Sequence, residues 1–410
     1  MAQADPQLHT GHRLALLEGS QPYFAALIAA MDAAQREVWL ETYIFDLTGS
    51  GTAVAEALAR AAQRGVHVRL VVDGVGTGHL PDAWQARFNA AGVQWRVFSP
   101  VGRLGLLLPR QWRRLHRKLC VVDGVVAFCG GINVLDDFHD PNHGTLAAPR
   151  FDFAVQVTGP LVSDVHATMQ QLWFQLQGLR NIRQRDFKGA VRSFRAAKLS
   201  VEPKSAAKNR AESPGNSRAA LVLRDNFRNR TRIERAYRKA IASAHSDIVI
   251  ANAYFLPGSK LRRALEMAAR RGVKVQLLLQ GKYEYFMQYH AARPVYGALL
   301  RAGVEIHEYA ASFLHAKVAV VDGHTERAWA TVGSSNLDPL SLLLAREANL
   351  LIEDAAFARQ LHDRLLQAMA RDGHRVNVAD YANRPWLQRA KERLALVVVS
   401  VALFVQGKRY

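Results

Sequence analysis

The sequence predicts an α/β protein made of two similar domains. Three observations support this: apolar strands alternate with helices, the order of elements returns in the second half, and one motif occurs once in each half. Such alternation is typical of a mixed, mostly parallel sheet with helices on its faces. A chain of 410 residues is also long enough for two pseudo-symmetric domains of this kind.

The first elements follow from apolar spacing. A short strand is predicted at residues 13–17, and a helix follows it with Ser20 as its N-cap. The apolar face of this helix is formed by four residues: Phe24, Leu27, Ile28 and Met31. Buried strands are predicted at residues 38–45 and 66–72, with a helix at 53–64 between them.

The second half repeats these elements. Residues 57–70 share their pattern of Ala, Leu and Arg-Gly-Val with residues 264–277, and both 91–93 and 302–304 read Ala-Gly-Val. The repeat therefore covers most of each half, and two similar α/β domains are its simplest explanation.

The repeated motif has the pattern H-x-K-x4-D and is followed by G-G-x-N or G-S-S-N. In the first copy His116 and Lys118 lie two residues apart in an apolar run, so a strand points both side chains to one face. Asp123 and Gly124 predict a turn, after which a return strand leads to Asn133. The second copy has the corresponding residues in the same order: His315, Lys317, Asp322 and Asn336.

These residue types suit a phosphate. An imidazole, an ammonium and an amide directed at one point can bind phosphate oxygens. Phosphodiester exchange also needs a nucleophile and an acid, roles that a neutral and a protonated histidine can supply. Four side chains would stabilise the phosphoryl charge, so that no metal or other cofactor is required: Lys118, Lys317, Asn133 and Asn336.

Carboxylates occupy matching positions in the two repeats. Asp152 and Glu347 each open an apolar strand, and each is a candidate to orient the imidazole of its own repeat. The alternative is that they cap backbone amides at the strand ends. Asp123 and Asp322 belong to the catalytic motif, yet they fall in turns beyond the strands, which indicates a structural role rather than proton transfer.

The composition limits the partners and the compartment. The net charge of +19 and the pI near 10.3 call for an acidic partner, either nucleic acid or an anionic membrane. Cys120 and Cys129 lie in apolar strands and are expected to be reduced core residues. No signal peptide is expected, and the 15 histidines show no metal-binding spacing such as H-E-x-x-H.

Three basic segments stand out. Residues 180–218, with eleven Lys or Arg against three acids, are expected to form a flexible linker between domains at 1–179 and 219–383. Residues 103–118 combine six positive charges with leucines and lead into the first motif. Residues 384–410 contain an uncharged apolar run that is too short to span a bilayer and is expected to contact a membrane surface. The alternative is that this run packs on the second domain.

Together these features resemble the phospholipase D superfamily, for which the doubled motif is specific. Three further stretches are similar to bacterial cardiolipin synthases of the short kind, which lack N-terminal transmembrane helices: residues 40–45, 251–257 and 333–339. The resemblance covers nearly the whole chain. It implies two pseudo-symmetric phospholipase D-like domains, one active site at their interface, no metal and a covalent phosphohistidine.

By this resemblance His116 is the nucleophile and His315 is the acid and then the base, an order that the residues themselves do not fix. The implied reaction transfers a phosphatidyl group between two phosphatidylglycerol molecules and gives cardiolipin and glycerol. The expected partners are anionic phospholipids at a membrane surface, without obligatory nucleic acid. The expected location is peripheral, on the cytoplasmic face of the bacterial inner membrane.

Three other functions fit parts of the sequence. A phospholipase D hydrolase would use the same residues with water as the acceptor. A metal-independent nuclease of the same superfamily would use the positive charge to bind DNA, but it would not need the apolar run at 394–405 or the leucines at 104–108. A non-enzymatic, basic membrane-binding protein would leave the two intact motifs unexplained.

Overall fold

The computed structural model describes these residues: 6–100, 113–140, 143–200, 215–225, 229, 231–282, 286–338, 345–382, 384–388, 390–392, 394 and 397. The chain divides into two compact units. The first unit, which holds the first motif, comprises Gln7–Asp136 and Ala154–Leu221. The second unit, which holds the second motif, comprises mainly Asp137–Phe153 and Val222–Tyr410.

The first unit contains a seven-stranded sheet with the order β2-β11-β8-β7-β3-β4-β5. Its strands have these bounds: β2 (Arg13–Glu18), β3 (Glu37–Thr42), β4 (His67–Asp73), β5 (Gln94–Phe98), β7 (Lys118–Val122), β8 (Val126–Gly130) and β11 (Phe153–Thr158). The strands β3, β4 and β5 are parallel, whereas β7, β8 and β11 add as antiparallel neighbours. The predicted mixed α/β class is confirmed, but the expectation of mostly parallel pairing is wrong, because parallel pairing is confined to β3, β4 and β5 and the motif hairpin adds antiparallel strands.

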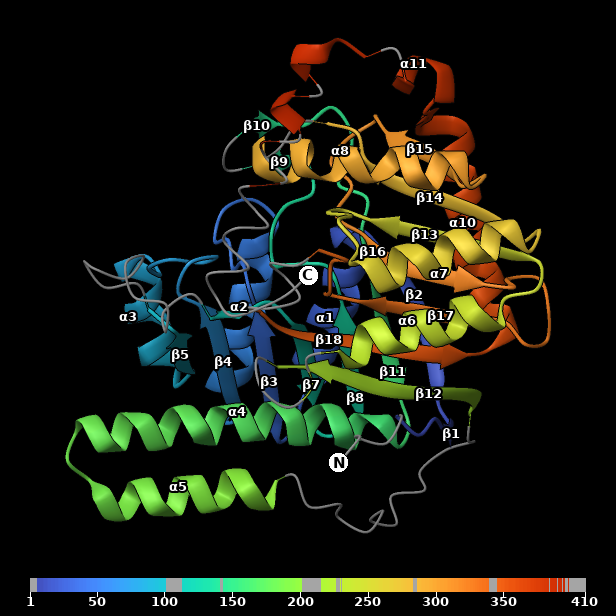
Figure 1. The fold of residues 1–410 in the computed structure, drawn as a ribbon. Coiled ribbons are helices and arrows are strands. Elements are labelled where there is room, and N and C mark those ends of the chain that lie inside the picture. The colour runs from blue at the N-terminus through green and yellow to red at the C-terminus, as the bar shows by residue number, and fades with distance from the viewer. Residues whose placement is uncertain are drawn as a thin grey trace. The chain divides into compact units, whose positions relative to one another are not determined.

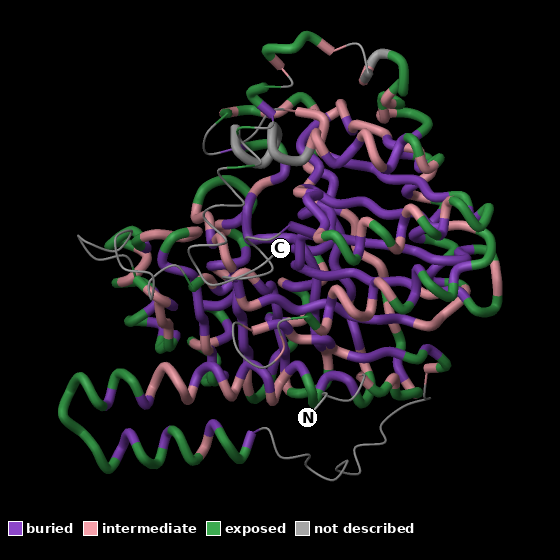
Figure 2. Tube along the Cα trace, viewed as in Figure 1, coloured by how far each residue is buried: buried purple, intermediate pink, exposed green. Residues whose placement is uncertain are grey.

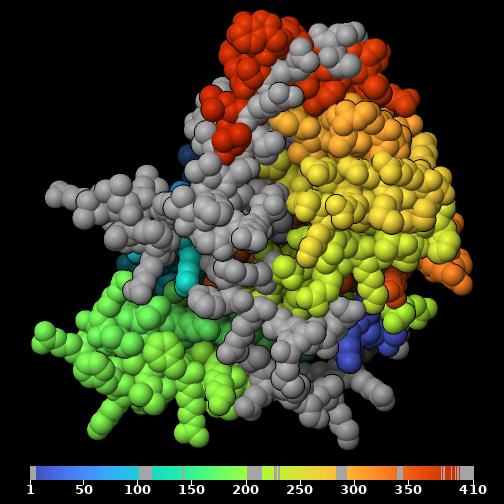
Figure 3. Space-filling view, viewed as in Figure 1, coloured from blue at the N-terminus to red at the C-terminus, as the bar shows by residue number. Residues whose placement is uncertain are grey.

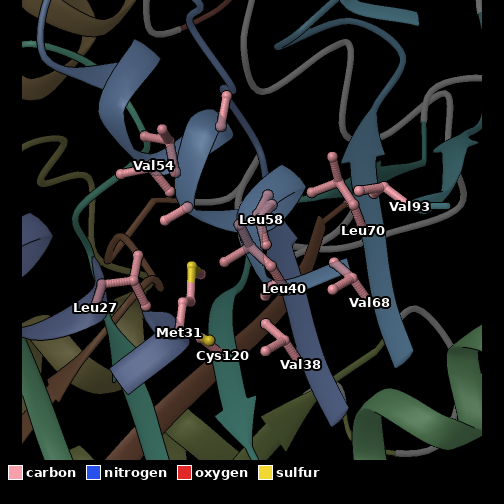
Figure 4. Close-up of a cluster of buried hydrophobic side chains, with 14 of the residues drawn as sticks. Leu27, Met31, Val38, Leu40, Val54, Leu58, Val68, Leu70, Val93 and Cys120 are labelled. Atoms are coloured by element: carbon pink, nitrogen blue, oxygen red, sulfur yellow. The ribbon is translucent and has the colours of Figure 1, made fainter. Parts of the chain in front are cut away.

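Four helices accompany this sheet: α1 (Ser20–Ala33), α2 (Gly51–Gln63), α3 (Asp82–Ala91) and α4 (Leu161–Arg183). Ser20 is the first residue of α1 rather than its cap, because the N-cap position is Gly19. The apolar faces of α1 and α2 pack on strand side chains to form a continuous core. Figure 4 shows part of this core, with these residues labelled: Leu27, Met31, Val38, Leu40, Val54, Leu58, Val68, Leu70, Val93 and Cys120.

The second unit repeats the arrangement, with strands in the order β18-β17-β16-β13-β14-β15-β19. Its strands are β13 (Asp247–Asn252), β14 (Lys274–Gln280), β15 (Glu305–Tyr309), β16 (Lys317–Val321), β17 (Trp329–Gly333), β18 (Ala345–Glu353) and β19 (Gly373–Arg375). Its helices are α6 (Arg232–Ser243), α7 (Ser259–Arg270), α8 (Phe286–Arg301), α10 (Ala355–Asp372) and α11 (Val378–Ala382). Again three strands that follow one another in the chain, β13, β14 and β15, are parallel, and the motif hairpin is antiparallel. In both units the strands are largely buried (Figure 2).

A short segment between β8 and β11 belongs to the second unit, although it comes from the first half of the sequence. It contains β9 (His139–Asp140) and β10 (Gly144–Thr145), which form a small antiparallel pair. Its last residues run beside the start of the second motif, because Phe151 forms a parallel bridge with Leu314. This excursion was not expected from the sequence.

The range 180–218, expected to be a flexible linker, is largely helical where it is described. Helix α4 (Leu161–Arg183) extends into it, and α5 (Phe187–Leu199) follows after a short turn. Figure 1 shows α5 running alongside α4. The strand β12 (Gly215–Arg224) then begins, and its first part pairs with β1 (His9–Gly11). The high charge suggested a flexible linker, but residues 187–199 form an amphipathic helix.

Two other basic segments fall largely outside the described residues. These are residues 101–112, before the first motif, and most of the tail after residue 392. In the described part of the tail, Arg384 forms an ion pair of 2.6 Å with the buried Glu392, while Trp386 is exposed. Among the helices of the described residues, none has both the length and the apolar character needed to cross a membrane.

Candidate functional site

In the first unit, the motif side chains stand at the beginning of β7. Lys118 Nζ donates a hydrogen bond of 2.6 Å to the backbone oxygen of His116. The Tyr43 ring centroid lies 4.9 Å from that of His116 and 5.4 Å from Lys118 Nζ. Lys118 is buried whereas His116 is partly exposed, so the imidazole is the more accessible of the two groups.

In the second unit, Lys317 likewise donates to the backbone oxygen of His315. Nδ1 of His315 lies 2.6 Å from Oδ2 of Asp152, which is buried. The other carboxylate oxygen of Asp152 accepts from the Phe153 N–H at 2.8 Å. A carboxylate on Nδ1 fixes the orientation of the ring and stabilises its protonated form.

The partner of Asp152 differs from the one that the sequence suggested. Asp152 was expected to orient His116, the histidine of its own repeat, but the structure places it against His315. The cause is the excursion at residues 137–153: the Phe151 carbonyl accepts from the N–H groups of His315 and Ala316, at 2.9 and 3.0 Å. The next residue is therefore beside the second motif.

Nδ1 of His315, the position expected for Glu347 from its place in the repeat, is bound by Asp152. Glu347 is buried in the second unit, and its Oε2 accepts a hydrogen bond of 2.5 Å from the Ser334 hydroxyl. The same hydroxyl accepts from the Ala348 N–H at 3.1 Å. Ser334 thus fixes the carboxylate of Glu347 to the loop that follows β17.

The motif aspartates hold the backbone in turns, as their position in the sequence predicts. Asp123 accepts from the N–H groups of residues 35–37, each at 2.8 Å, and Asp322 accepts from those of residues 245–247. Burial alone would raise the pKa of both carboxyls, but these backbone donors lower the pKa below the usual value. Both aspartates have left-handed φ angles, 53° and 52°. Their contacts point to turn formation rather than proton transfer.

The motif asparagines are buried close to the strand ends. The carbonyl oxygen of Asn133 accepts from the Ile44 N–H at 3.1 Å, so its amide NH₂ is the group that could donate to a phosphate. Asn336 is also buried in the second unit. In that unit Asn252 accepts from the Leu337 N–H at 3.1 Å, so each repeat has an asparagine that ties the motif loop to the adjacent strand.

Each repeat has one polar residue, not predicted from the sequence, that binds the backbone just before the motif histidine. Asp73, at the end of β4, accepts from the Leu115 N–H at 2.7 Å, and Gln280, at the end of β14, accepts from the Leu314 N–H at 3.1 Å. Burial raises the pKa of Asp73, although its backbone donors act in the opposite direction. A polar residue ending an otherwise apolar strand at the same repeat position was the available signal.

Arg117 lies between the motif His and Lys but points to the opposite face of the strand. Its guanidinium forms two hydrogen bonds with the buried Glu41, at 2.5 and 3.2 Å, and both side chains are almost fully buried. Arg117 is one of the six positive charges of the basic segment at residues 103–118, yet it is buried. Strand alternation explains this, because successive side chains point to opposite faces.

In the described part of the chain, one group of side chains is close enough to share a metal ion: His324, His362 and Asp363. His362 lies with Nε2 at 2.9 Å from Asp247 and Nδ1 at 3.2 Å from Asp363. The hydrogen bond to Asp247 raises the pKa of His362, while burial opposes that shift. A ring that donates from both nitrogens is a cation, so we interpret the group as an ion-pair cluster.

The chain is similar in sequence to a known family and to known proteins. Residues 27–150 and 237–369 match the family model described as cardiolipin synthase, PLD-like domain. The chain is 38% identical to cardiolipin synthase B of Escherichia coli K12, over 94% of this chain and 87% of that protein. It is 29% identical to the cardiolipin synthase of Geobacillus thermodenitrificans, over 95% and 74% of the two chains.

A solved structure shares the fold. Phosphatidylserine synthase of Haemophilus influenzae superposes with a TM-score of 0.65 and covers 95% of this chain and 97% of its own. Its sequence identity is 12%, so this likeness concerns the fold alone.

Proposed function

The chain belongs to the cardiolipin synthase family with PLD-like domains and is an enzyme that transfers phosphatidyl groups, and we propose that its reaction joins two phosphatidylglycerol molecules. The products would be cardiolipin and glycerol. The observation that carries the proposal is the duplicated His/Lys motif, in which His315 is held by a buried carboxylate. The relatives named cardiolipin synthase supply the choice of substrate.

The proposed steps use two histidines in complementary roles. Nε2 of His116 attacks the phosphorus of the first phosphatidylglycerol, a P–N bond forms, and the P–O bond to glycerol breaks. Protonated His315 gives its proton to the leaving alkoxide. Neutral His315 then takes a proton from the hydroxyl of a second phosphatidylglycerol, whose oxygen attacks phosphorus and releases His116.

The geometry supports His315 as the acid and base. A carboxylate on Nδ1 stabilises the imidazolium form, which is the form that donates a proton. Lys118, Lys317, Asn133 and Asn336 would bind the phosphoryl oxygens, and Glu347 would orient an imidazole. Asp123 and Asp322 would act through the turns that they stabilise.

The substrate proposal is tested with phosphatidylglycerol vesicles and product separation by chromatography and mass spectrometry. We expect cardiolipin and glycerol in equal amounts, with the rate unchanged by EDTA. Phosphatidic acid as the main product would instead indicate a hydrolase. Cleavage of single-stranded or duplex DNA without any lipid product would indicate a nuclease and would contradict the proposal.

The roles of the histidines are tested with His116→Ala and His315→Ala, each expected to lower kcat by at least about 10³-fold. A phosphatidyl ester of p-nitrophenol has a leaving group that needs no acid. With this substrate His315→Ala should accumulate a phosphatidyl adduct on His116, detectable as a mass increase of one peptide. An adduct on His315 in the His116→Ala variant would reverse the two roles. His79→Ala, an exposed histidine, is the control.

The substrate class also implies a location. We propose that the enzyme acts as a peripheral protein on the cytoplasmic face of the inner membrane. Anionic phospholipid headgroups are the expected partners, because the net charge of +19 favours an acidic surface. Binding to vesicles should therefore rise with the fraction of anionic lipid and fall with salt.

A further inference from the structure

The last part of α4 and the first part of α5 expose a group of large apolar side chains. Five large apolar side chains are exposed over a short stretch of chain: Leu179, Ile182, Phe187, Val191 and Phe194. Phe187 and Val191 are 66% and 68% exposed, which is high for apolar residues in an ordered helix. Grouped apolar exposure of this kind indicates an interaction surface.

The two helices pack in a way that sets this surface. Helix α5 buries only small residues: Gly189, Ala190, Ser193 and Ala197. Because these residues face α4, Phe187 and Val191 point away from the buried side, while Phe194 lies at its edge. Phe187, Val191 and Phe194 follow one another at intervals of four and three residues, so they form one stripe along α5. The ring of Phe194 lies over Gly178 of α4, 2.7 Å from where a Cβ would be, so the stripe begins beside α4.

Positive charge surrounds the stripe. From residue 180 to residue 198 there are seven Arg or Lys: Arg180, Arg183, Arg185, Lys188, Arg192, Arg195 and Lys198. All seven are exposed. The one acid in this stretch, Asp186, caps α5 by accepting from the Gly189 N–H at 2.8 Å. In Figure 3 long side chains project from this region, coloured light green.

We propose that this stripe and its surrounding cations, which we call the hairpin surface, dock the enzyme on an anionic lipid bilayer. The apolar side chains would enter the boundary between headgroups and acyl chains, and the seven cations would bind lipid phosphates. An amphipathic helix with a cationic border is the form that suits this position. The inference rests on the proposed function only in its choice of phosphatidylglycerol as the anionic lipid.

The charge pattern favours a bilayer over a protein partner or a second copy of this chain. A second copy would bring seven like charges against seven, which is repulsive. A bilayer presents a laterally continuous negative surface, so each cation can find a phosphate whatever its exact position. The same surface would keep the enzyme where its lipid substrate is.

Helix α7 provides a comparison within the same molecule. It is also basic and amphipathic, but its exposed large apolar residue is single, Met267. Its cations are partly neutralised, since Arg262 lies 3.5 Å from Glu266. Positive charge on a helix is therefore common to both elements, whereas the apolar stripe distinguishes α5.

The test measures co-flotation with vesicles of phosphatidylglycerol and phosphatidylcholine in a one-to-one ratio. Val191→Glu should weaken vesicle affinity at least tenfold, and Met267→Glu, with the same charge change at an exposed site, should alter it less than twofold. Arg192→Gln with Arg195→Gln should weaken binding severalfold, and more at low salt than at high salt. The matched control is Arg263→Gln with Arg270→Gln on α7. All variants should keep the melting temperature of the wild type, because the substituted side chains are exposed.

Equal flotation of Val191→Glu and Met267→Glu would overturn the inference. Binding that depends on Val191 but is unchanged when phosphatidylcholine replaces all phosphatidylglycerol would also overturn it, because the cations would then have no role. Loss of binding to a protein from cell extract, with vesicle binding intact, would assign the surface to a protein partner instead.

Activity measurements separate this inference from the proposed function. With short-chain phosphatidylglycerol below its critical micelle concentration, Val191→Glu should form cardiolipin at the wild-type rate. On vesicles its rate should be lower than that of the wild type. If no variant makes cardiolipin but flotation still depends on Val191, the proposed function fails and the docking surface stands. If the wild type and Val191→Glu form cardiolipin on vesicles at the same rate, the proposed function stands and the docking surface fails.

Discussion

The two units have the same sheet order and the same motif, yet they fill equivalent positions with different chemistry. Strand registers define the equivalence: Glu41 pairs with Leu119 in the first unit, and Ala251 pairs with Val318 in the second. In both, the motif lysine donates to the carbonyl of the motif histidine, and the motif aspartate holds a turn. The shared features are therefore those that shape the backbone around the motif.

The two repeats differ in the side chains that lie beside the motif. The buried ion pair Arg117–Glu41 of the first unit has Ala316 and Ala251 in its place in the second. Gly131 in the first motif corresponds to Ser334, whose hydroxyl binds Glu347. This contact gives a physical meaning to the difference between Gly-Gly and Gly-Ser-Ser. The two repeats thus share the backbone contacts around the motif, while the side-chain contacts beside it differ.

The strongest way to test this divergence is to remove the support of one histidine. Asp152→Asn should lower kcat by about 10²- to 10⁴-fold with little change in KM, because an amide neither fixes the Nδ1–H tautomer nor stabilises the imidazolium. The measurement is steady-state kinetics on phosphatidylglycerol across pH, where the basic limb of the profile should move to lower pH.

The matched control is Asp363→Asn, which alters another aspartate paired with a histidine, His324, at 2.8 Å. This variant should retain the wild-type kcat. If Asp152→Asn kept a kcat within twofold of the wild type, Asp152 would have no part in orienting His315.

A second test concerns the ion pair present in one repeat and absent from the other. Arg117→Met should lower the free energy of unfolding by about 3–5 kcal/mol, because it leaves the Glu41 carboxylate buried without its partner. The double variant Glu41→Met with Arg117→Met should lose less than half as much, since both charges are gone, as at the alanine pair of the second repeat. Urea unfolding followed by tryptophan fluorescence measures both. A double variant as unstable as the single one would show that packing, and not the unpaired charge, sets the cost.

Much of the fold could be predicted from the sequence. The spacing of apolar residues identified β2, β3, β4 and the motif hairpin, because burial on one face imposes a period on the sequence. The turn role of Asp123 followed from its place after a strand. These features depend on neighbours close along the chain, and local patterns carry that information.

Contacts between distant residues were the part that the sequence could not supply. Strand alternation placed His116 and Lys118 on one face. It did not reveal that Arg117, on the other face, forms an ion pair with Glu41. Likewise, repeat logic paired Asp152 with His116, since nothing local shows that residues 137–153 pack in the second unit. Residues 187–199 were predicted to be a linker because they are basic, whereas they form a helix whose small residues face α4.

The smallest expected effect is a pH dependence of stability that comes from a histidine cluster in the second repeat. In both repeats, a histidine on the helix after the motif faces the acid that opens the first parallel strand: His166 with Glu37, and His362 with Asp247. In the second repeat His362 also meets Asp363, and His324 packs against it with ring centroids 4.7 Å apart. The hydrogen bond to Asp247 raises the pKa of His362 above its ordinary value, although burial opposes it.

A folded-state pKa above the unfolded value of about 6.5 adds stability that is fully present below that pH and is lost as pH rises through the folded pKa. The free energy of unfolding should therefore decline above pH 6.5 with a slope of at most about 1.4 kcal/mol per pH unit from this group. His362→Gln should remove that decline, whereas His79→Gln, at an exposed site, should leave it in place. Thermal melts at half-unit steps from pH 6 to pH 9 measure the slope. An identical pH dependence in His362→Gln and the wild type would mean that His362 is not the cation that ties α10 to β13, and the cluster would then be held by its other hydrogen bonds.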